Sequence, residues 1–434
     1  MPQRLNSTAA GFETAFQALI GAKREVSEDV NQSVAEILSA VAAHGDAALL
    51  DYTARFDRLV LSPSRLAFGV AEIDAALAAC DRTALDALEL AAARIEAYHR
   101  RQMPQDDLYT DEIGIQLGHR WTALGAVGMY VPGGTASYPS SVLMNAIPAR
   151  VAGVPRRVMV MPTPDGNFNP LTLAAARLAG VHEIYRIGGA QAVGALAYGT
   201  ASIAPVDKIT GPGNAWVAAA KRQIFGAVGI DMIAGPSEIL VVADGANDPA
   251  WIAADLLSQA EHDVSAQSIL LTDDAAFADA VVAAIAVHLQ TLPRAAIAAQ
   301  SWDTNGAIIL VQNMDAAPAL IDRIAPEHLQ LAVENPHALM ARVRNAGAIF
   351  LGRHTPEAIG DYIAGPNHVL PTARAARYAS GLSVLDFMKR TTLIGCTPDG
   401  LAALAPAAAT LAASEGLHAH GRSITIRLNS RSKT

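Results

Sequence analysis

Two short stretches carry side chains that could bind a metal ion or exchange protons, namely Gln259–His262 (QAEH) and the pair Glu327-His328. The first lies at the end of a helix predicted over Trp251–Ala260, where positions three and four residues apart share one face. Taken alone, this pattern favours a solvated helix end, because glutamine is a poor ligand for transition metals and one histidine does not make a metal site.

The pair Glu327-His328 precedes a predicted strand in which Leu329, Leu331 and Val333 alternate with other residues. A carboxylate and an imidazole at the start of a strand can act as two titrating groups in one pocket. The alternative is a surface glutamate beside a histidine at a strand edge, and the pattern alone favours this alternative.

Other possible ligands are distant in the sequence. Asp361 lies in a predicted loop rich in glycine and proline (360–368), and the segment 414–420 contains a glutamate and two histidines. His262, Asp361 and His420 would supply three of the usual zinc ligands. Spacing alone does not show that they meet.

Glycine-rich turns follow predicted strands at Val131–Gly134, Gly188–Gly194 and Gly211–Asn214. Backbone N–H groups at such a turn, together with the start of the next helix, can face a phosphate. The spacing differs from G-x-G-x-x-G, so a tight strand-to-helix turn explains each one separately. Two of them at adjacent strand ends favour a nucleotide cleft at the carboxyl edge of a sheet.

The elements that would position these residues change along the chain. Residues 1–121 are predicted to be largely helical, whereas 122–238 and 239–380 alternate short apolar strands with helices, as parallel β–α–β units do. The chain is predicted to become helical again from residue 381 and to end in a strand at 423–428. We therefore expect an α/β fold of two Rossmann-like domains with incomplete, mostly parallel sheets, plus small helical N-terminal and C-terminal segments.

The expected division has four parts. They are an N-terminal arm (1–25), a discontinuous first α/β domain (26–121 and 239–380), a second Rossmann-like domain (122–238) and a C-terminal segment (381–434).

Composition excludes several classes of protein. The 434 residues are 51% hydrophobic, carry a net charge of −9 and contain no basic run, so a nucleic-acid partner is not expected. No signal peptide or membrane span is predicted, and the expected location is the cytoplasm. The chain has only two cysteines, Cys80 and Cys396, which excludes a disulfide framework and fits a reducing compartment. Cys80 lies in an alanine-rich helical pattern and Cys396 in an apolar segment, which disfavours a catalytic thiol.

In combination and order, these motifs resemble the histidinol dehydrogenase family. The resemblance covers nearly the whole chain and rests on Tyr130–Gly134 (YVPGG), Ser137–Ser141 (SYPSS), Gly188–Ala192 (GGAQA), Gly211–Asn214 (GPGN), Ile233–Glu238 (IAGPSE), Gln259–His262 (QAEH), Glu327-His328, Gly360–Tyr362 (GDY), Asn367-His368 and Glu415–His420 (EGLHAH).

The resemblance implies oxidation of L-histidinol through L-histidinaldehyde to L-histidine, the last two steps of histidine biosynthesis, with two NAD⁺ reduced at one site. It also implies one zinc ion per subunit, NAD binding by 122–238, and a homodimer in which the segment 381–434 completes the partner's site. Carried over by position, it assigns zinc binding to Gln259, His262, Asp361 and His420, catalysis to Glu327 and His328, NAD binding to Tyr130, Gln191 and Asn214, and substrate binding to Ser237, Gln259, His262, His328, Asp361, Glu415 and His420.

Physical roles can be expected for three of these residues. His328 would take the alcohol proton, because an imidazole titrates near neutrality. Glu327 would activate water for the second oxidation, and partial burial should raise its pKa. Glu415 would bind the substrate imidazole. His418 is a second candidate ligand beside His420.

Two other functions are compatible with this pattern. One is a dehydrogenase of the same family for another primary alcohol, such as a sulfonated propanediol, although a carboxylate at Glu415 would repel a sulfonate. The other is a non-catalytic zinc-binding or regulatory protein, which the complete ligand set and the intact Glu327-His328 pair disfavour.

Overall fold

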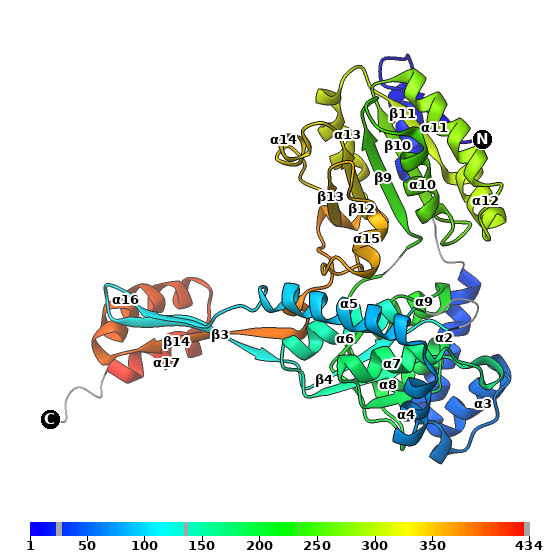
Figure 1. Ribbon diagram of the computed structural model, residues 1–434. Coiled ribbons are helices and arrows are strands. Elements are labelled where there is room, and N and C mark those ends of the chain that lie inside the picture. Colours follow the sequence, from blue (N-terminus) through cyan, green and yellow to red (C-terminus); the bar gives the residue numbers. More distant parts are fainter. Residues whose placement is uncertain (23–27, 134–137, 234, 429–434) are drawn as a thin grey trace. The chain divides into compact units, whose positions relative to one another are not determined.

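The computed structural model describes residues 1–22, 28–133, 138–233 and 235–428 (Figure 1). Gly134, Ser137 and Ala234 of the sequence motifs therefore lie outside the described residues. The chain forms two compact units, the first from Met1–Gln102 and Gly125–Phe387, the second from Met103–Leu124 and Met388–Thr434. None of the described helices is both long and apolar enough to cross a membrane.

The first unit contains a five-stranded, wholly parallel sheet with the order β6-β5-β4-β7-β8. All five residues of β4 are buried, as expected for a parallel strand covered on both faces. The strands are β4 (Ala126–Tyr130), β5 (Arg156–Val160), β6 (Glu183–Tyr185), β7 (Lys208–Thr210) and β8 (Gly229–Ile230), and the helices between them are α6 (Pro139–Val151), α7 (Pro170–Ala179), α8 (Gly189–Tyr198) and α9 (Ala215–Ile224).

Helices from the N-terminal part pack against the helices that flank this sheet. They are α2 (Glu28–His44), α3 (Asp46–Phe56), α4 (Val70–Ala79) and α5 (Arg82–Arg100). Val34, Leu38 and Leu49 are buried in the same core as Val158 and Val193. The sequence grouped residues 26–121 with the other sheet, because helical periodicity reveals an apolar face but not which sheet covers it. The division into domains otherwise stays a prediction.

The first unit also contains a six-stranded parallel sheet with the order β1-β11-β10-β9-β12-β13. Counted from β9, its strand order repeats that of the five-stranded sheet. Separate apolar cores lie on its two faces. The strands are β1 (Gln3–Asn6), β9 (Glu238–Ala243), β10 (Gln267–Thr272), β11 (Ala307–Leu310), β12 (His328–Ala332) and β13 (Ala348–Leu351), and the helices are α1 (Phe12–Gly21), α10 (Pro249–Ala260), α11 (Ala275–His288), α12 (Ala295–Asn305), α13 (Ala317–Ile324), α14 (Pro336–Met340) and α15 (Glu357–Tyr362).

The second unit is a three-stranded antiparallel sheet with two helices. Its strands are β2 (Asp107–Thr110), β3 (Ile115–Ala123) and β14 (Met388–Cys396), in the order β14-β3-β2, and its helices are α16 (Pro398–Ser414) and α17 (His418–Thr425).

The sequence missed these three strands and wrongly predicted a strand at 423–428. β2 and β14 are largely exposed and β3 is mostly of intermediate burial, so the three strands lack the regular apolar alternation by which a strand is predicted. The alternating C-terminal residues lie in α17 and the short turn of helix that follows it. The predicted α/β class, with two mostly parallel sheets, is nevertheless confirmed.

Candidate functional site

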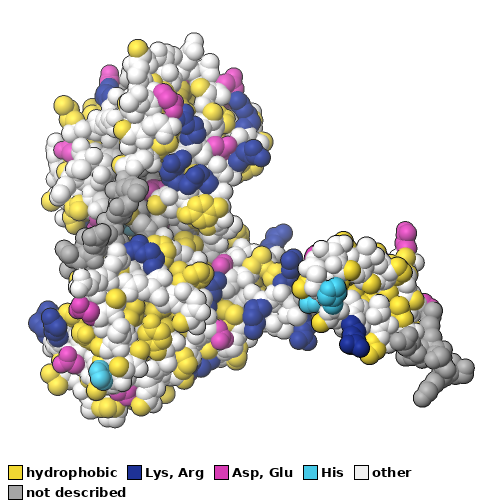
Figure 2. Space-filling model, turned by 180° about the vertical axis from the view of Figure 1, so that it is seen from behind, with side chains coloured by type: hydrophobic (Ala, Val, Ile, Leu, Met, Phe, Trp, Pro, Cys, Tyr) yellow, Lys and Arg dark blue, Asp and Glu magenta, His cyan; other side chains and the backbone are white. Residues whose placement is uncertain are grey.

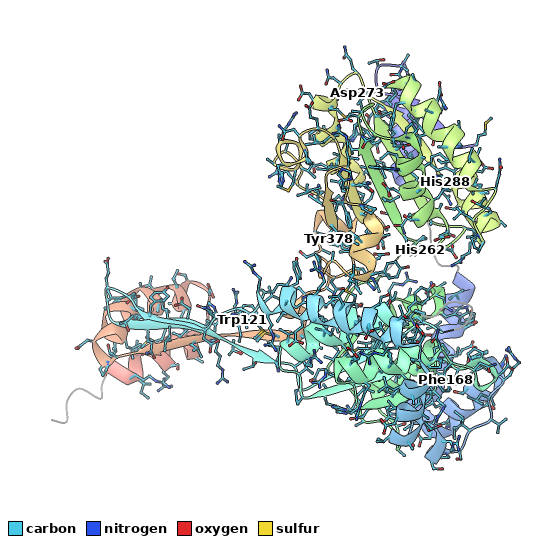
Figure 3. The ribbon with its side chains drawn as sticks, viewed as in Figure 1. Trp121, Phe168, His262, Asp273, His288 and Tyr378 are labelled. Carbon is cyan, nitrogen blue, oxygen red and sulfur yellow. The ribbon has the colours of Figure 1, made fainter. Side chains whose placement is uncertain are left out.

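Titratable side chains gather at the amino ends of strands β9 and β12 of the six-stranded sheet. His328 is the first residue of β12 and pairs with Ile239 of β9. The carboxyl end of α10 lies at this same edge, so that His262, just beyond α10, and Asp273, just beyond β10, mark opposite ends of the domain (Figure 3). The structure therefore brings together the two stretches that the sequence singled out.

His328 is buried and has a defined tautomer. Its Nδ1 lies 2.9 Å from the carbonyl oxygen of Glu238, and because a carbonyl can only accept, Nδ1 carries the proton. Burial lowers the pKa of His328, so the ring is neutral at neutral pH. Its Nε2 is also buried and has no hydrogen-bond partner among the described residues. This nitrogen is free to accept a proton.

Glu327 lies beside this imidazole and is 6% exposed. Its Oε2 is 3.6 Å from Nδ1 of His328 and accepts a hydrogen bond of 2.8 Å from the backbone N–H of Glu238. Burial raises the pKa of Glu327 well above its usual value, and the neighbouring carboxylates raise it further. The rise expected from the sequence is confirmed.

Helix α15 adds two carboxyl groups to the cluster. Oε1 of Glu357 and Oδ1 of Asp361 lie 3.5 and 3.8 Å from Nε2 of His328. Glu357 is 1% exposed, and burial together with Asp361 raises the pKa of its carboxyl well above the usual range. Glu357 was not among the residues predicted from the sequence, although its spacing of four residues from Asp361 places both carboxyls on one helix face.

The same edge fits a metal ion. Both amide atoms of Gln259 are buried without a partner among the described residues, a costly arrangement unless a ligand satisfies them. Burial lowers the pKa of His328 and the pKa of His368. A positive charge on the exposed His262 would lower both values further. Because α10 packs against α15, Gln259, His262 and Asp361 share this edge.

His328 and His368 are further possible metal ligands at this edge. His328, Glu357 and Asp361 present ligand atoms within 4.8 Å of one another, a set that shares only Asp361 with the predicted zinc ligands. His368, for which no role was predicted, lies with its Nδ1 2.9 Å from the carbonyl oxygen of Asp361. A cavity of about 640 Å³ has His328, Asp361 and His368 among its lining residues.

The remaining predicted substrate residues are Ser237, Glu415 and His420. Ser237 is half-buried and immediately precedes β9. Glu415, at the end of α16, and His420, in α17, are exposed side chains of the second unit. Their assignment to substrate and zinc stays a prediction.

The predicted NAD residues line one cavity at the carboxyl edge of the five-stranded sheet. This cavity, of about 460 Å³, includes Tyr130 at the end of β4, Gln191 in the first turn of α8 and Asn214 at the start of α9. The edge lies where the strand order reverses between β4 and β7, the usual place for a nucleotide in such sheets. Two helix N-termini reach it, as a pyrophosphate would require.

Local contacts fix the loops around this cavity. The hydroxyl of Tyr130, whose pKa burial raises to about 12, accepts a hydrogen bond of 3.0 Å from the backbone N–H of Gly189. Gly211 has a φ of +106°, and a Cβ there would lie 2.1 Å from the carbonyl oxygen of Tyr130. Its N–H donates to Asp231 at 2.8 Å, and its carbonyl accepts from Lys221 at 3.0 Å.

The corresponding carboxyl edge of the six-stranded sheet is occupied by the protein's own side chains. Asp244 follows β9 and accepts two hydrogen bonds, of 2.8 and 2.7 Å, from the guanidinium of Arg353. Asn247 donates to the carbonyl oxygen of Ala332 at 2.7 Å. The two sheets therefore use different edges. The five-stranded sheet carries the cavity at its carboxyl edge, whereas the six-stranded sheet carries the acid–base cluster at its amino edge.

Two parallel sheets, a nucleotide-type cavity and a buried acid–base cluster define an α/β enzyme. The histidinol dehydrogenase family model matches residues 21–428. Histidinol dehydrogenases of Rhodospirillum rubrum and Rhizobium meliloti are 65% identical over 430 residues and 64% identical over 429 residues, each covering 99% of both chains. The crystal structure of histidinol dehydrogenase from Elizabethkingia anophelis superimposes with a TM-score of 0.95 at 36% identity, covering 100% of this chain and 99% of that one.

The chain belongs to the histidinol dehydrogenase family, whose members are oxidoreductases.

Proposed function

We propose that this protein oxidises L-histidinol through L-histidinaldehyde to L-histidine, with NAD⁺ as the oxidant in both steps and one zinc ion per subunit. The observation that carries the proposal is the bare, buried Nε2 of neutral His328 beside the buried carboxyl of Glu327. One base can remove the proton of the alcohol, and a second can take a proton from the water that adds to the aldehyde. Cys80 and Cys396 are free, which supports a cytoplasmic location.

His328 acts first in this proposal. Its Nδ1–H is held by the Glu238 carbonyl, so the unprotonated Nε2 faces the substrate hydroxyl and takes its proton. Burial keeps the ring neutral, and therefore ready to act, to a lower pH than an exposed histidine. NAD, when bound, supplies the acceptor for the hydride that leaves the same carbon.

Glu327 acts in the second step by removing a proton from the water that adds to the aldehyde. Burial makes its carboxylate a stronger base than a solvated glutamate, and the N–H of Glu238 stabilises the ionised form. Neither described cysteine lies in the cluster, so water rather than a thiol is the nucleophile that these residues support.

Gln259, His262 and Asp361 would hold zinc, together with His420. The partnerless amide of Gln259 and the carboxylate of Asp361 support this assignment. Zinc, when bound, supplies a positive charge that holds the amino group and the imidazole of the substrate. Ser237 and Glu415 complete the proposed substrate contacts.

The functional form is proposed to be a homodimer in which Glu415 and His420 serve the partner's site. The second unit supports this, because it exposes large apolar side chains that a second copy would cover (Figure 2). These include Ile394 at 72% exposed, Leu411 at 64% and Ile426 at 59%.

The stoichiometry of the reaction tests the proposal. Purified zinc-loaded protein should form about two NADH per L-histidinol consumed, measured by absorbance and by chromatography of the products, and should contain about one zinc per chain by elemental analysis. A matched reaction with a sulfonated propanediol should give no NADH. Turnover of that alcohol without turnover of histidinol would favour the related dehydrogenase, and zinc without any turnover would favour a binding protein.

A further inference from the structure

Asp57 is a buried carboxyl that the proposed chemistry does not use. It follows α3, and its backbone is fixed from both sides, since its N–H donates to the Thr53 carbonyl at 2.9 Å and its carbonyl accepts from Asp165 at 2.8 Å. Its side chain is 7% exposed and lines the cavity that also contains Tyr130 and Gln191. It comes from the N-terminal helices, not from the Gly-rich turns.

One oxygen of this carboxyl lacks a partner in the part of the chain that the structure describes. Among the described residues, Oδ2 of Asp57 is buried and makes no hydrogen bond. The adjacent Arg58 turns its guanidinium to Asp165, with its Nε 2.8 Å from Oδ1, so it does not supply the missing donor. A buried carboxylate without donors is costly, and such groups in native proteins normally meet a ligand, an ion or a water molecule.

The polar groups around the cavity indicate the kind of ligand that would satisfy Asp57. Oε1 of Gln191 is a second buried acceptor without a partner among the described residues. None of the described residues that line the cavity is a lysine or an arginine. Although burial raises the pKa of Asp57 to about 6, its carboxyl is largely ionised at neutral pH. The cavity wall at Asp57 thus suits hydroxyl donors and disfavours a phosphate.

A dinucleotide carries both hydroxyl donors and phosphate groups. Its pyrophosphate suits the helix N-termini at Gly189 and Asn214, whereas its ribose offers two neighbouring hydroxyls. In NADP one of these hydroxyls bears a phosphate dianion. In nucleotide-binding sheets an acidic side chain commonly selects the unphosphorylated ribose, and an arginine accommodates the phosphate.

We propose that Asp57 accepts hydrogen bonds from the adenosine ribose of the bound dinucleotide and makes this cavity selective for NAD over NADP. This inference rests on the proposed function for its dinucleotide. Asp57 is then a specificity-determining residue that belongs to the helical layer over the sheet.

The test compares Asp57→Asn with wild type and with Asp51→Asn, which makes the same change at an exposed position of α3. Binding of NAD and NADP to each zinc-loaded protein is measured by calorimetry, and kcat/KM is measured with histidinol. A hydrogen bond to a charged group contributes about 1.5–3 kcal/mol, so Asp57→Asn should weaken NAD binding about 10- to 100-fold. Its NAD-to-NADP preference should fall by at least as much, while kcat at saturating NAD stays within about twofold, since Asp57 touches no reacting atom.

Three outcomes decide the question. Loss of the preference in Asp57→Asn, with Asp51→Asn unchanged, supports the inference. An unchanged preference in a variant with a native circular dichroism spectrum overturns it and leaves the proposed function intact. A wild type that binds neither dinucleotide overturns the NAD dependence and the inference together. Asp57→Ser provides a second variant, with the same expected loss, should Asp57→Asn misfold.

Discussion

At the scale of single residues, the proposed catalytic pair Glu327-His328 is held by two contacts with one backbone segment. The carbonyl of Glu238 fixes the tautomer of His328, and the N–H of the same residue binds Glu327. Both side chains are therefore positioned before a substrate arrives, which lowers the cost of reaching a reactive geometry.

Replacing Glu327 by glutamine should separate the two oxidations. The amide cannot take a proton from water, so the second step should slow by about 10²- to 10⁴-fold, as is typical for the loss of a general base. The first step should continue, so that NADH per histidinol falls from about two toward one and the aldehyde accumulates. Rapid-quench analysis with an aldehyde-trapping reagent measures both quantities.

Glu334→Gln is the matched control, because Glu334 is exposed beyond the far end of β12. It should retain about two NADH per histidinol. Full conversion to histidine by Glu327→Gln at the wild-type rate would mean that another group activates the water.

At the scale of elements, two sheets with the same strand order serve different purposes. The five-stranded sheet leaves its carboxyl edge open, with the turn after β7 fixed by a buried ion pair between Lys221 and Asp231. The six-stranded sheet closes that edge with Asp244 and Arg353 and carries its titratable groups at the amino edge.

Lys221→Met should destabilise the protein more than an exposed substitution of the same kind. Lys221 and Asp231 are almost fully buried, with side-chain exposures of 4% and 1%, and the change would leave a buried carboxylate without its cation. Removal of one member of a buried pair typically costs about 3–5 kcal/mol. Urea unfolding followed by circular dichroism measures the loss, and the affinity for NAD should fall with it because the pair fixes the Gly211 turn.

Arg82→Met is the control for this experiment. Arg82 pairs with Asp86 on the surface, and exposed pairs contribute roughly 0–1 kcal/mol. Equal destabilisation by the two substitutions would show that burial of the Lys221–Asp231 pair has no special role.

At the scale of the whole molecule, the proposed site needs two chains, because Glu415 and His420 belong to the second unit and would serve a partner. Hybrid dimers test this directly. Purified hybrids of a Gln259→Ala chain with a His420→Ala chain should recover about half of the wild-type activity, since one of the two sites would contain only native residues. Differently tagged chains permit purification, and NADH formation gives the readout.

A hybrid of Gln259→Ala with Asp361→Ala provides the control. Both residues belong to the first unit, so each site would retain one defect and the hybrid should be inactive. Inactivity of the Gln259–His420 hybrid as well would contradict sharing of sites between subunits.

The sequence alone determined the α/β class and the cavity at the turns. Parallel strands covered on both faces require continuous apolar runs, and turns that approach another backbone closely require glycine, so both leave local patterns. The turns by themselves predicted only a nucleotide cleft. Tyr130, Gln191 and Asn214 were assigned to NAD through the resemblance to the family, and all three line the cavity. The exposed strands of the second unit left no such pattern and were missed.

Only the tertiary structure decided which distant side chains meet. Glu357 joins His328, and Asp57 joins Gln191, through packing between elements far apart in the sequence. Burial then shifts the pKa values of these carboxyls, and burial depends on every layer that covers a residue. The pair Glu327-His328 was a plausible surface motif in the sequence, and the low exposure of both side chains makes it a candidate catalytic pair.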